Sequence, residues 1–397
     1  MPAPITVFGD VDARAVEQLE RCAEQGDALR GVLCADGHVG YSQPIGGAVA
    51  YTDHISPSGV GYDIACGNKA CRTSILARDL APHLGRVMDE IFERISFGVG
   101  RKNDEPVDHP VLHRIADADF APQRALRDLA ARQLGTVGGG NHYVDLFEGD
   151  DGHVWIGVHF GSRGFGHKTA SGFLALAQGL PFDGRAAGGE MDSPPTLLHV
   201  DSELGRSYIA AMELAGEYAY AGRDTVVAKV LEILGAESLY EVHNHHNFAW
   251  RERHFGTDVW VIRKGCTPAF PGQEGFVGAT MGEPSVVLRG AESEPSRELL
   301  YSTVHGAGRV MSRTQAAGRW RKGKQIKPGL IDYRAVRKEL ATSGIELRGG
   351  AADEAPAAYK RLDAVLAAHG ETIEVVHRLR PIGVAMAGAG TFDPYKD

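Results

Sequence analysis

Apolar residues recur with a period near 3.6 in several segments, a spacing that places them on one face of a helix. We predict helices at 12–25, 79–96 and 122–134, and one or two helices in an alanine-rich stretch from about 202 to 235. Shorter apolar runs predict strands, which lie at 154–160, 238–243, 257–263 and near 373–386. Three segments are predicted to be exposed loops, at 99–112, at 178–196 and from Arg348 to Asp353.

The organisation of the chain is continuous rather than modular. A length of 397 residues allows one large domain or two, and the 51 glycines gather in short polar motifs. No internal repeat is evident. Because motifs from both halves of the chain would have to meet at one site, we predict a single compact domain of the α+β class over residues 1–397.

Composition limits the kind of partner that the protein can bind. A hydrophobic content of 43% allows a sizeable core, and a net charge of −9 argues against an indiscriminate basic binder of nucleic acid. Binding of RNA would need a local basic patch. The best candidates are Arg319, Arg321, Lys322, Lys324 and Lys327, although a solvated surface loop explains the same run equally well.

The five cysteines, at positions 22, 34, 66, 71 and 266, form no paired framework, which suits a reducing compartment. We see no signal peptide and no apolar run long enough to span a membrane. The sequence therefore predicts a cytoplasmic protein without a membrane partner.

His305 is the most informative residue for chemistry. It lies in the stretch Val304-His305-Gly306-Ala307-Gly308-Arg309, where the glycines allow backbone N–H groups to approach a phosphate closely. A neutral imidazole in such a turn can attack phosphorus as a nucleophile. Most histidines flanked by glycine are turn residues, so this motif alone is a weak signal.

Other segments supply metal-binding side chains. Asp63 and Cys66 stand three positions apart in a glycine-flanked loop, where a carboxylate and a thiolate can reach one metal and the thiolate can bridge two. A buried cysteine that behaves as a small hydrophobe is the alternative. Further histidines follow at His142, at His159 and in the stretch 243–246, each within two positions of glycine or asparagine, and such a set is better explained by an imidazole cluster around metal.

Together these motifs resemble the RtcB family of RNA ligases over nearly the whole chain. The matching pieces stand in the family's order: Asp36-Gly37-His38-Val39-Gly40, Pro44-Ile45-Gly46-Gly47, Gly61-Tyr62-Asp63-Ile64-Ala65-Cys66-Gly67, Gly140-Asn141-His142, His159-Phe160-Gly161-Ser162-Arg163-Gly164, His246-Asn247, Arg263-Lys264-Gly265, Met281-Gly282, His305-Gly306-Ala307-Gly308-Arg309 and Glu354-Ala355-Pro356-Ala357-Ala358-Tyr359-Lys360.

The resemblance implies a fold with a central cleft for metal and nucleotide, and a ligase that depends on GTP and two Mn²⁺ ions. Such a ligase joins an RNA 3′-phosphate or 2′,3′-cyclic phosphate end to a 5′-hydroxyl end, and the need for an activating protein is left open. His305 would be the nucleophile that takes GMP. The implied metal ligands are Asp63, Cys66, His142, His159 and His246, with Cys66 bridging. The implied nucleotide contacts are Asn141, Asp145, Asn247, Thr280, Ser285, Gly306, Ala307, Gly308 and Tyr359.

The sequence departs from the family pattern in two places. Asp145 stands where the family usually has glutamate, so this side chain reaches less far. Met386 falls near the position of a terminal lysine that contacts guanine in the family, and a further tail follows it. Either Lys396 in that tail replaces the lysine, or the protein discriminates guanine from other bases poorly.

Several residues and functions keep alternative interpretations. We interpret Arg163 as a phosphate-binding residue, and Asp36 and His38 as residues that orient ligands. Lys264 either touches RNA or braces a loop. The rival functions are a dinuclear metallohydrolase that opens cyclic phosphates without joining ends, and a non-catalytic protein that binds RNA ends.

Overall fold

Two β-sheets form the centre of the structure, a computed structural model that describes residues 2–186, 191–321 and 324–389. The first sheet holds strands from both halves of the chain. In spatial order these strands are β1 (Ile5–Val7), β2 (Ala28–His38), β3 (Ile45–Tyr51), β11 (Thr257–Lys264) and β10 (Asn247–His254). Strand β1 runs parallel to β2, and the other neighbours pair antiparallel.

The second sheet also mixes early and late segments. Its strands are, in spatial order, β13 (Glu274–Val277), β14 (Ser285–Gly290), β19 (Ile373–Gly388), β6 (Tyr143–Gly149), β7 (His153–Phe160), β5 (Gly67–Leu76) and β9 (Ser238–His245), with β18 (Glu346–Gly350) parallel to β19. Smaller pairs are β4 (His54–Ile55) with β8 (Leu198–His199), β12 (Cys266–Pro268) with β15 (Ser302–Val304), and β16 (Arg319–Arg321) with β17 (Lys324–Lys327).

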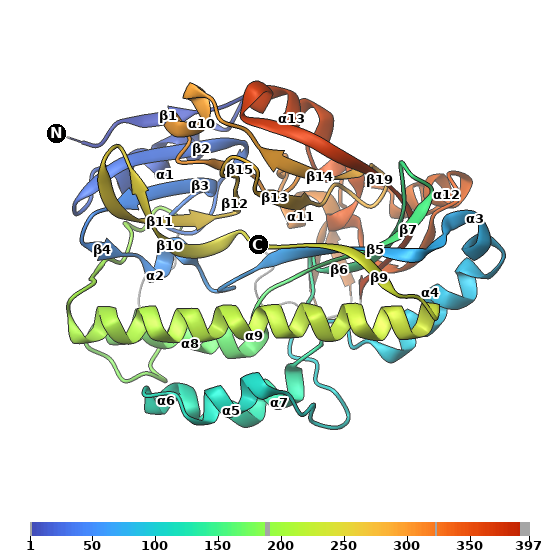
Figure 1. Ribbon diagram of the computed structural model, residues 1–397, viewed down its shortest axis with the longest axis horizontal. Coiled ribbons are helices and arrows are strands. Elements are labelled where there is room, and N and C mark those ends of the chain that lie inside the picture. The colour runs from blue at the N-terminus through green and yellow to red at the C-terminus, as the bar shows by residue number, and fades with distance from the viewer. Residues whose placement is uncertain (1, 187–190, 322–323, 390–397) are drawn as a thin grey trace.

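One long helix, α9 (Glu203–Leu234), runs beneath the sheets along most of the molecule (Figure 1). Its first half shares a core with the first sheet, where Tyr208 and Met212 pack with Val49. Its second half shares a core with the second sheet, where Val226 and Val230 pack with Ile156. Helices α8 (Arg163–Leu176) and α5 (Pro110–Ala116) contact α9. A single rigid helix therefore supports both sheets.

The remaining helices are short and surround the sheets (Figure 1). They are α1 (Ala13–Ala23), α2 (Pro57–Val60), α3 (Ala77–Leu80), α4 (Leu84–Arg94), α6 (Ala121–Arg124), α7 (Arg127–Gln133), α10 (Glu294–Glu298), α11 (Arg313–Ala317), α12 (Tyr333–Thr342) and α13 (Leu362–His369).

The chain crosses from the second sheet to the first at His246, between β9 and β10. A third core lies where the sheets meet, and it contains Val32 and Val261 of the first sheet and Val277 and Leu288 of the second. Residues near this junction are therefore brought together from distant parts of the chain, which confirms the predicted α+β architecture.

The strand predictions are confirmed, with β7, β9, β11 and β19 at the expected places. Of the helix predictions, 12–25 corresponds to α1 and 202–235 to the single helix α9. The helix predicted at 79–96 is wrong as one piece, because Pro82 lies in a 3₁₀ turn (Ala81–His83) between α3 and α4. The helix predicted at 122–134 is divided into α6 and α7, and nothing in the local sequence explains the break.

Two loop predictions need correction. Helix α5 begins inside the predicted loop 99–112, because Pro110 suits a first helical turn and His109 accepts a hydrogen bond from Val111 N–H. The stretch from Arg348 to Asp353 is not an exposed loop. Its first residues belong to β18, and Asp353 is buried because Arg313 pairs with it. The loop at 178–196 contains no helix or strand in its described residues, and residues 187–190 lie outside them.

No helix in the described ranges has the length and the apolar character needed to cross a bilayer. Within the predicted basic run, Lys322 and the side chains of Arg321 and Lys324 lie outside what the structure describes. Lys396 and the rest of the tail from residue 390 also lie outside it.

Candidate functional site

Five side chains predicted to bind metal form one cluster at the junction of the sheets. Their ligand atoms fall into two groups, each with all atoms within 4.8 Å of one another, and Cys66 belongs to both. The groups are Cys66, His159 and His246, and Asp63, Cys66 and His142. The thiol sulfur of Cys66 lies 3.3 Å from His159 Nε2 and 3.6 Å from His142 Nε2. Cys66 is therefore the residue that the two candidate groups share.

Backbone geometry brings these side chains close. Ala65 adopts a positive φ of 59° in the loop that carries Asp63 and Cys66, just before β5. Gly161, which follows His159 and β7, leaves space for Asp63, because a Cβ at that glycine would lie 2.2 Å from Asp63 Oδ1. The glycine after the histidine is thus needed for the approach of carboxylate and imidazole.

Burial sets the protonation state of the cluster. It lowers the pKa values of His142, His159 and His246 below the ordinary range, so their imidazoles are neutral near pH 7 and can donate lone pairs to a metal. Burial and the Asp63 charge raise the pKa of the Cys66 thiol. A thiolate here needs a neighbouring cation. His246 Nδ1 and His142 Nδ1 are buried without a partner. The donor set of sulfur, imidazole and carboxylate therefore fits divalent transition metals.

Arg223 of α9, fully buried with 0% exposure, supports the cluster from behind. Its guanidinium donates to the backbone carbonyls of Ala65 at 3.0 Å and Phe160 at 2.6 Å, which precede Cys66 and follow His159. It also contacts His243 Nε2 at 2.7 Å and His245 Nδ1 at 2.9 Å. These two histidines therefore hold Arg223, which leaves His246 in the metal cluster. Sequence reasoning missed Arg223, which lies in no motif.

The variant Arg223→Met is expected to lower the free energy of unfolding by about 2–4 kcal/mol, because two buried carbonyls lose their donors. It should also weaken metal binding, since the Ala65 and Phe160 backbone positions the ligands. Thermal unfolding and metal analysis measure the two effects. The matched control is Lys229→Met on the same helix, where the half-buried amine donates to the Arg94 carbonyl at 3.3 Å. Equal losses in both variants would contradict the assigned role.

His305 lies beside this cluster, and its ring centroid is 4.9 Å from that of His246. Asp36 Oδ2 lies 2.6 Å from His305 Nδ1 and accepts hydrogen bonds from the backbone N–H groups of His305 and Gly306. Burial opposes ionisation of Asp36, but the contacts with His305 outweigh it and keep the pKa of Asp36 below its ordinary value. Since the carboxylate holds a proton on Nδ1, the Nε2 lone pair of His305 is free to react.

Asp36 therefore orients the predicted nucleophile, a more specific role than the orientation of ligands that the sequence suggested. Gly308 makes room for this arrangement, because a Cβ there would lie 2.3 Å from the Asp36 carbonyl oxygen and its φ is +77°. His38 accompanies the pair, with Nδ1 2.9 Å from the Asp36 carbonyl. Burial lowers the pKa of His38 to about 4, so this ring is neutral near pH 7.

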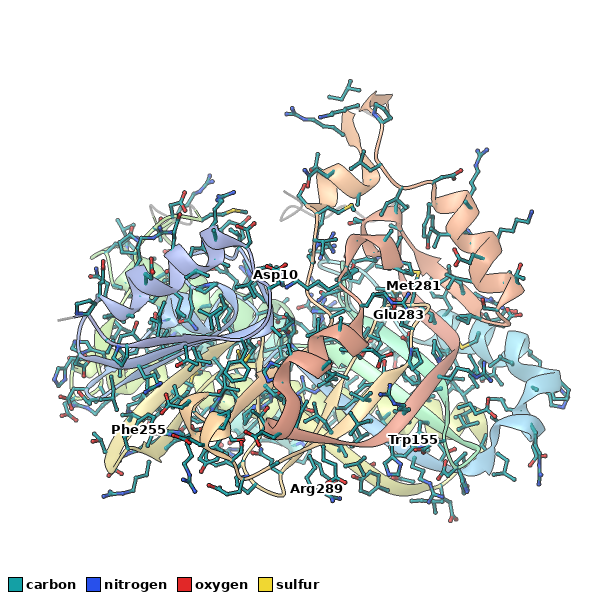
Figure 2. All side chains as sticks on the ribbon, turned by 90° about the horizontal axis from the view of Figure 1, so that it is seen from above. Asp10, Trp155, Phe255, Met281, Glu283 and Arg289 are labelled. Carbon is teal, nitrogen blue, oxygen red and sulfur yellow. The ribbon has the colours of Figure 1, made fainter. Side chains whose placement is uncertain are left out.

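A cavity of about 230 Å³ opens next to His305. Most of the predicted nucleotide contacts line it, namely Asn141, Asp145, Thr280, Gly306, Ala307, Gly308 and Tyr359. Thr280 Oγ1 and Asp145 Oδ1 are buried without partners, and burial raises the pKa of Asp145 well above its ordinary value. A protonated Asp145 can donate a hydrogen bond to a ligand. Met281, also in the lining, is labelled near the middle of the view from above (Figure 2).

Two predicted nucleotide contacts do not line this cavity. Ser285 Oγ accepts a hydrogen bond from Ala279 N–H and so shapes the cavity wall from behind. Asn247 accepts a hydrogen bond from Gly265 N–H at 2.7 Å and donates to the Asp63 carbonyl at 3.3 Å. Asn247 therefore lies nearer the metal cluster.

Arg163 and Lys264 differ in what they contact. Arg163 adopts a positive φ of 53° next to the metal cluster, and its buried Nε has no hydrogen-bond partner among the residues that the structure describes. No carboxylate within the described residues forms an ion pair with it. Lys264 donates to the carbonyls of Tyr41 at 2.5 Å and Ser58 at 3.4 Å. Lys264 therefore braces a loop, while Arg163 keeps donors for a ligand.

Comparison with known proteins agrees with this geometry. A family model described as tRNA-splicing ligase RtcB matches residues 18–387. The chain belongs to the RtcB family. It is 31% identical to the RNA-splicing ligase RtcB of Escherichia coli (strain K12) over 94% of both chains. It is also 31% identical to the tRNA-splicing ligase RtcB of Thermococcus kodakarensis, over 89% of this chain and 87% of that protein. The RtcB prediction is confirmed, and with it an enzyme of the ligase class.

Proposed function

We propose that this protein is a GTP-dependent and Mn²⁺-dependent RNA ligase that joins 3′-phosphate or 2′,3′-cyclic phosphate ends to 5′-hydroxyl ends. The observation that carries the proposal is the position of His305. Asp36 holds the imidazole of His305 through Nδ1, which leaves Nε2 available. The His305 side chain lines the nucleotide cavity, and its ring lies against that of His246 in the metal cluster. A metallohydrolase would need the cluster but not the Asp36–His305 pair.

The reaction follows from the lone pair on His305. Its Nε2 attacks the α-phosphorus of GTP, a P–N bond forms, and pyrophosphate leaves as the bond to the β-phosphate breaks. An oxygen of the RNA 3′-phosphate then takes the guanylate and frees the imidazole. The 5′-hydroxyl attacks the activated 3′-phosphate, loses its proton and expels GMP. Water opens a cyclic phosphate end before this sequence begins.

The chain's own groups position these reactants. Asp36 holds His305 Nδ1 and so leaves Nε2 as the nitrogen that can react, and Asn141 and Thr280 offer hydrogen bonds at the wall of the cavity. Arg163 has free donors for a phosphate of the RNA end. Metals held by Asp63, Cys66, His142, His159 and His246 would neutralise phosphate charge. Zinc binds such ligands more tightly than manganese, so the activity test must supply Mn²⁺ in excess.

The test is to supply α-labelled GTP and Mn²⁺ with an RNA that carries a 3′-phosphate or a 2′,3′-cyclic phosphate and a second RNA that carries a 5′-hydroxyl. We expect transient labelling of the protein and a joined RNA. An opened cyclic phosphate without labelled protein or joined RNA would instead support the hydrolase.

We also propose a cytoplasmic location, because the five buried cysteines are free thiols. The need for an activating protein is tested by adding cell extract to a pure preparation.

A prediction concerns the base of the nucleotide. Met386 lines the cavity with 5% exposure and cannot donate the hydrogen bond of a lysine, a charge-assisted contact worth about 1.5–3 kcal/mol. We therefore expect guanylation and adenylation of His305 to differ by less than about tenfold in rate. The comparison uses the intact chain and a chain ending at Gly388. A strong preference for GTP that disappears on truncation would assign the contact to the tail, and one that survives truncation would mean that guanine is recognised elsewhere.

A further inference from the structure

Positive charge is concentrated in one segment of this acidic protein. Residues 309–338 contain ten arginines and lysines and one acidic residue, Asp332. The segment therefore carries a formal charge of +9 in a chain whose net charge is −9, and the remainder carries −18. Such a distribution repels a polyanion from most of the surface and attracts it to this segment.

The basic segment begins at the nucleotide cavity. Arg309 and Arg313 line the cavity, but both are engaged by the protein itself. Arg309 donates to Tyr359 Oη at 2.8 Å, and Arg313 pairs with Asp353 at 3.2 Å. The chain continues through α11 and the β16–β17 hairpin into α12. The hairpin and α12 together stand out from the rest of the fold in the view from above (Figure 2).

Helix α12 has two different faces. Its apolar residues Tyr333, Val336 and Leu340 pack in a cluster that contains Met281 and Met386 of the cavity wall. Arg334, Arg337 and Lys338 are exposed, and together they form what we call the α12 basic face. No ion pair joins these three to a carboxylate in the described part of the chain. The helix is thus tied to the nucleotide cavity on one side and presents cations on the other.

The α12 basic face contributes nothing to helix stability. Arg334 and Lys338 stand at i and i+4, and Arg334 and Arg337 at i and i+3, so each pair places like charges on neighbouring turns. Pairs of this kind destabilise an isolated helix by a few tenths of a kcal/mol. An anionic partner bound to this face would relieve that repulsion.

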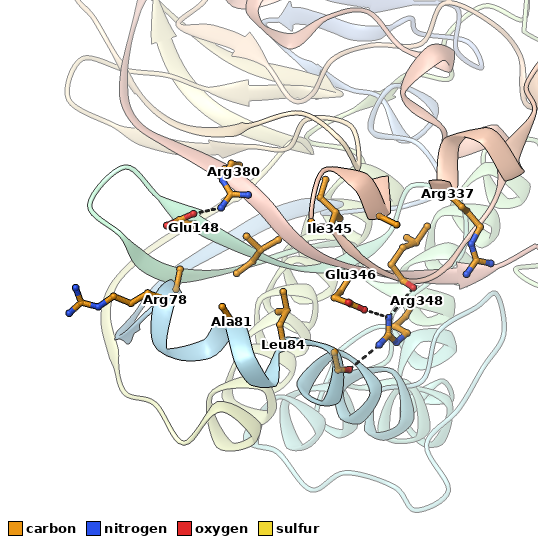
Figure 3. A pocket seen from close by; sticks show the side chains of 15 residues that line it. Arg78, Ala81, Leu84, Glu148, Arg337, Ile345, Glu346, Arg348 and Arg380 are labelled. Carbon is orange, nitrogen blue, oxygen red and sulfur yellow. Dashed lines mark hydrogen bonds and ion pairs between the residues drawn. The ribbon is translucent and has the colours of Figure 1, made fainter. Parts of the chain in front are cut away.

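A cavity beside α12 extends the same surface. It has a volume of about 660 Å³ and lies between α3, α4 and the strands β18 and β19 (Figure 3). Arg348 and Arg380 in its lining are joined to Glu346 and Glu148. Arg337 of the α12 basic face stands at the rim and has no such partner among the residues drawn (Figure 3). Because glutamates neutralise Arg348 and Arg380 inside the cavity, the positive charge of this surface comes from Arg337 at its rim.

Exposed apolar side chains lie within the same segment. Val310 is 55% exposed, Ile326 56% and Leu330 75%. An unpaired nucleic-acid strand has phosphates that bind cations and bases that bury apolar surface, so it can use both kinds of side chain.

We propose that the α12 basic face binds the phosphate backbone of a single RNA strand, beyond the nucleotides held at the active site. The inference rests on the proposed ligase function, because it names where the same RNA substrate continues. The apolar side of α12 packs in one cluster with Met281 and Met386, which line the nucleotide cavity, and its opposite side presents cations near the site proposed for the RNA end.

The test uses the full chain with Arg334, Arg337 and Lys338 all changed to alanine, a residue that favours helices. Affinity for a single-stranded RNA of 20 nucleotides with a 3′-phosphate is measured over a range of KCl concentrations. Each phosphate contact to a single strand contributes about 0.7 to the slope of log K against log salt. We expect the slope to fall by about 2 and the affinity at ~0.1 M KCl to fall by about 10- to 100-fold.

The control variant carries Arg14→Ala, Arg132→Ala and Arg251→Ala, which remove the same charge from exposed sites on α1, α7 and β10. Its slope should stay within experimental error of that of the unchanged protein. Equal losses in both variants, or a loss in neither, would overturn the proposal. Loss of binding to poly-glutamate with unchanged RNA affinity would also overturn it and assign the face to an acidic protein.

Guanylation with GTP alone separates this inference from the proposed function. The triple variant of α12 should label His305 at the same rate as the unchanged protein, since that step needs no RNA. An unchanged protein that takes no guanylate, but whose RNA affinity depends on the α12 basic face, would reject the ligase proposal and retain the RNA surface. Normal guanylation with no role of α12 in RNA binding would reject only the surface.

Discussion

The variant His305→Ala is expected to take up no labelled guanylate and to lose ligation by a factor of about 10⁴ or more, because no other imidazole in the cavity has the same support. The label on the unchanged protein should be labile in acid and stable in alkali, as expected of a phosphoramidate. Labelling is followed on denaturing gels with α-labelled GTP and Mn²⁺. Full labelling of His305→Ala would refute the assignment of the nucleophile.

The control for this prediction is Asp36→Asn, which keeps the size of the side chain that holds His305 Nδ1. An amide carries no negative charge and can turn its NH2 group toward Nδ1, which favours the other tautomer, so the rate of labelling should fall by about 10²–10⁴ while the label remains detectable. Both variants should retain the metals of the unchanged protein, since neither residue belongs to the metal groups. A loss of metal in His305→Ala would make its inactivity uninformative about the nucleophile.

The variant Cys66→Ala should lose manganese from both sites, with affinities lower by at least about 10²-fold, since a bridging thiolate serves two ions. His246→Ala should affect mainly the site that it shares with Cys66 and His159. Metal content is measured after dialysis against buffers of defined Mn²⁺ concentration. The matched control is Cys71→Ala, because Cys71 is also buried but lies within β5 and belongs to neither metal group. Two fully occupied sites in Cys66→Ala would show that the thiolate does not bridge.

An element of the fold could be predicted when the residues that determine it lie within the element itself. The strand β7 and the second half of β19, from Pro381 on, are apolar runs buried among neighbours, and their residue types alone predict them. The burial of Asp353 could not be predicted, because Arg313, forty positions away, provides its charge partner. A carboxylate in a polar stretch looks exposed until its cation is known. The break of the 79–96 helix was visible in principle as Pro82, but the apolar spacing outweighed it.

The candidate site was predictable where chemistry is carried by residue type. Cysteine, histidine and aspartate beside glycines are the donors that metal and phosphate require, so Cys66, His142 and His159 were named from their motifs. Arg223 was not, because an arginine inside a long alanine-rich helix has the sequence context of a surface residue. Its contacts with Ala65 and Phe160 arise only when α9 packs under both strands.

The sequence by itself determined the family and pointed to the candidate metal donors and the candidate nucleophile, because each depends on the chemical identity of side chains in short segments. Only the tertiary structure decided which of these side chains contact one another. It placed Asp36 against His305 across 269 positions of sequence, assigned His243 and His245 to Arg223, and set Asn247 and Ser285 outside the nucleotide cavity. The physical reason is that hydrogen bonds and charge interactions act over a few ångströms in space, and separation along the chain carries no record of them.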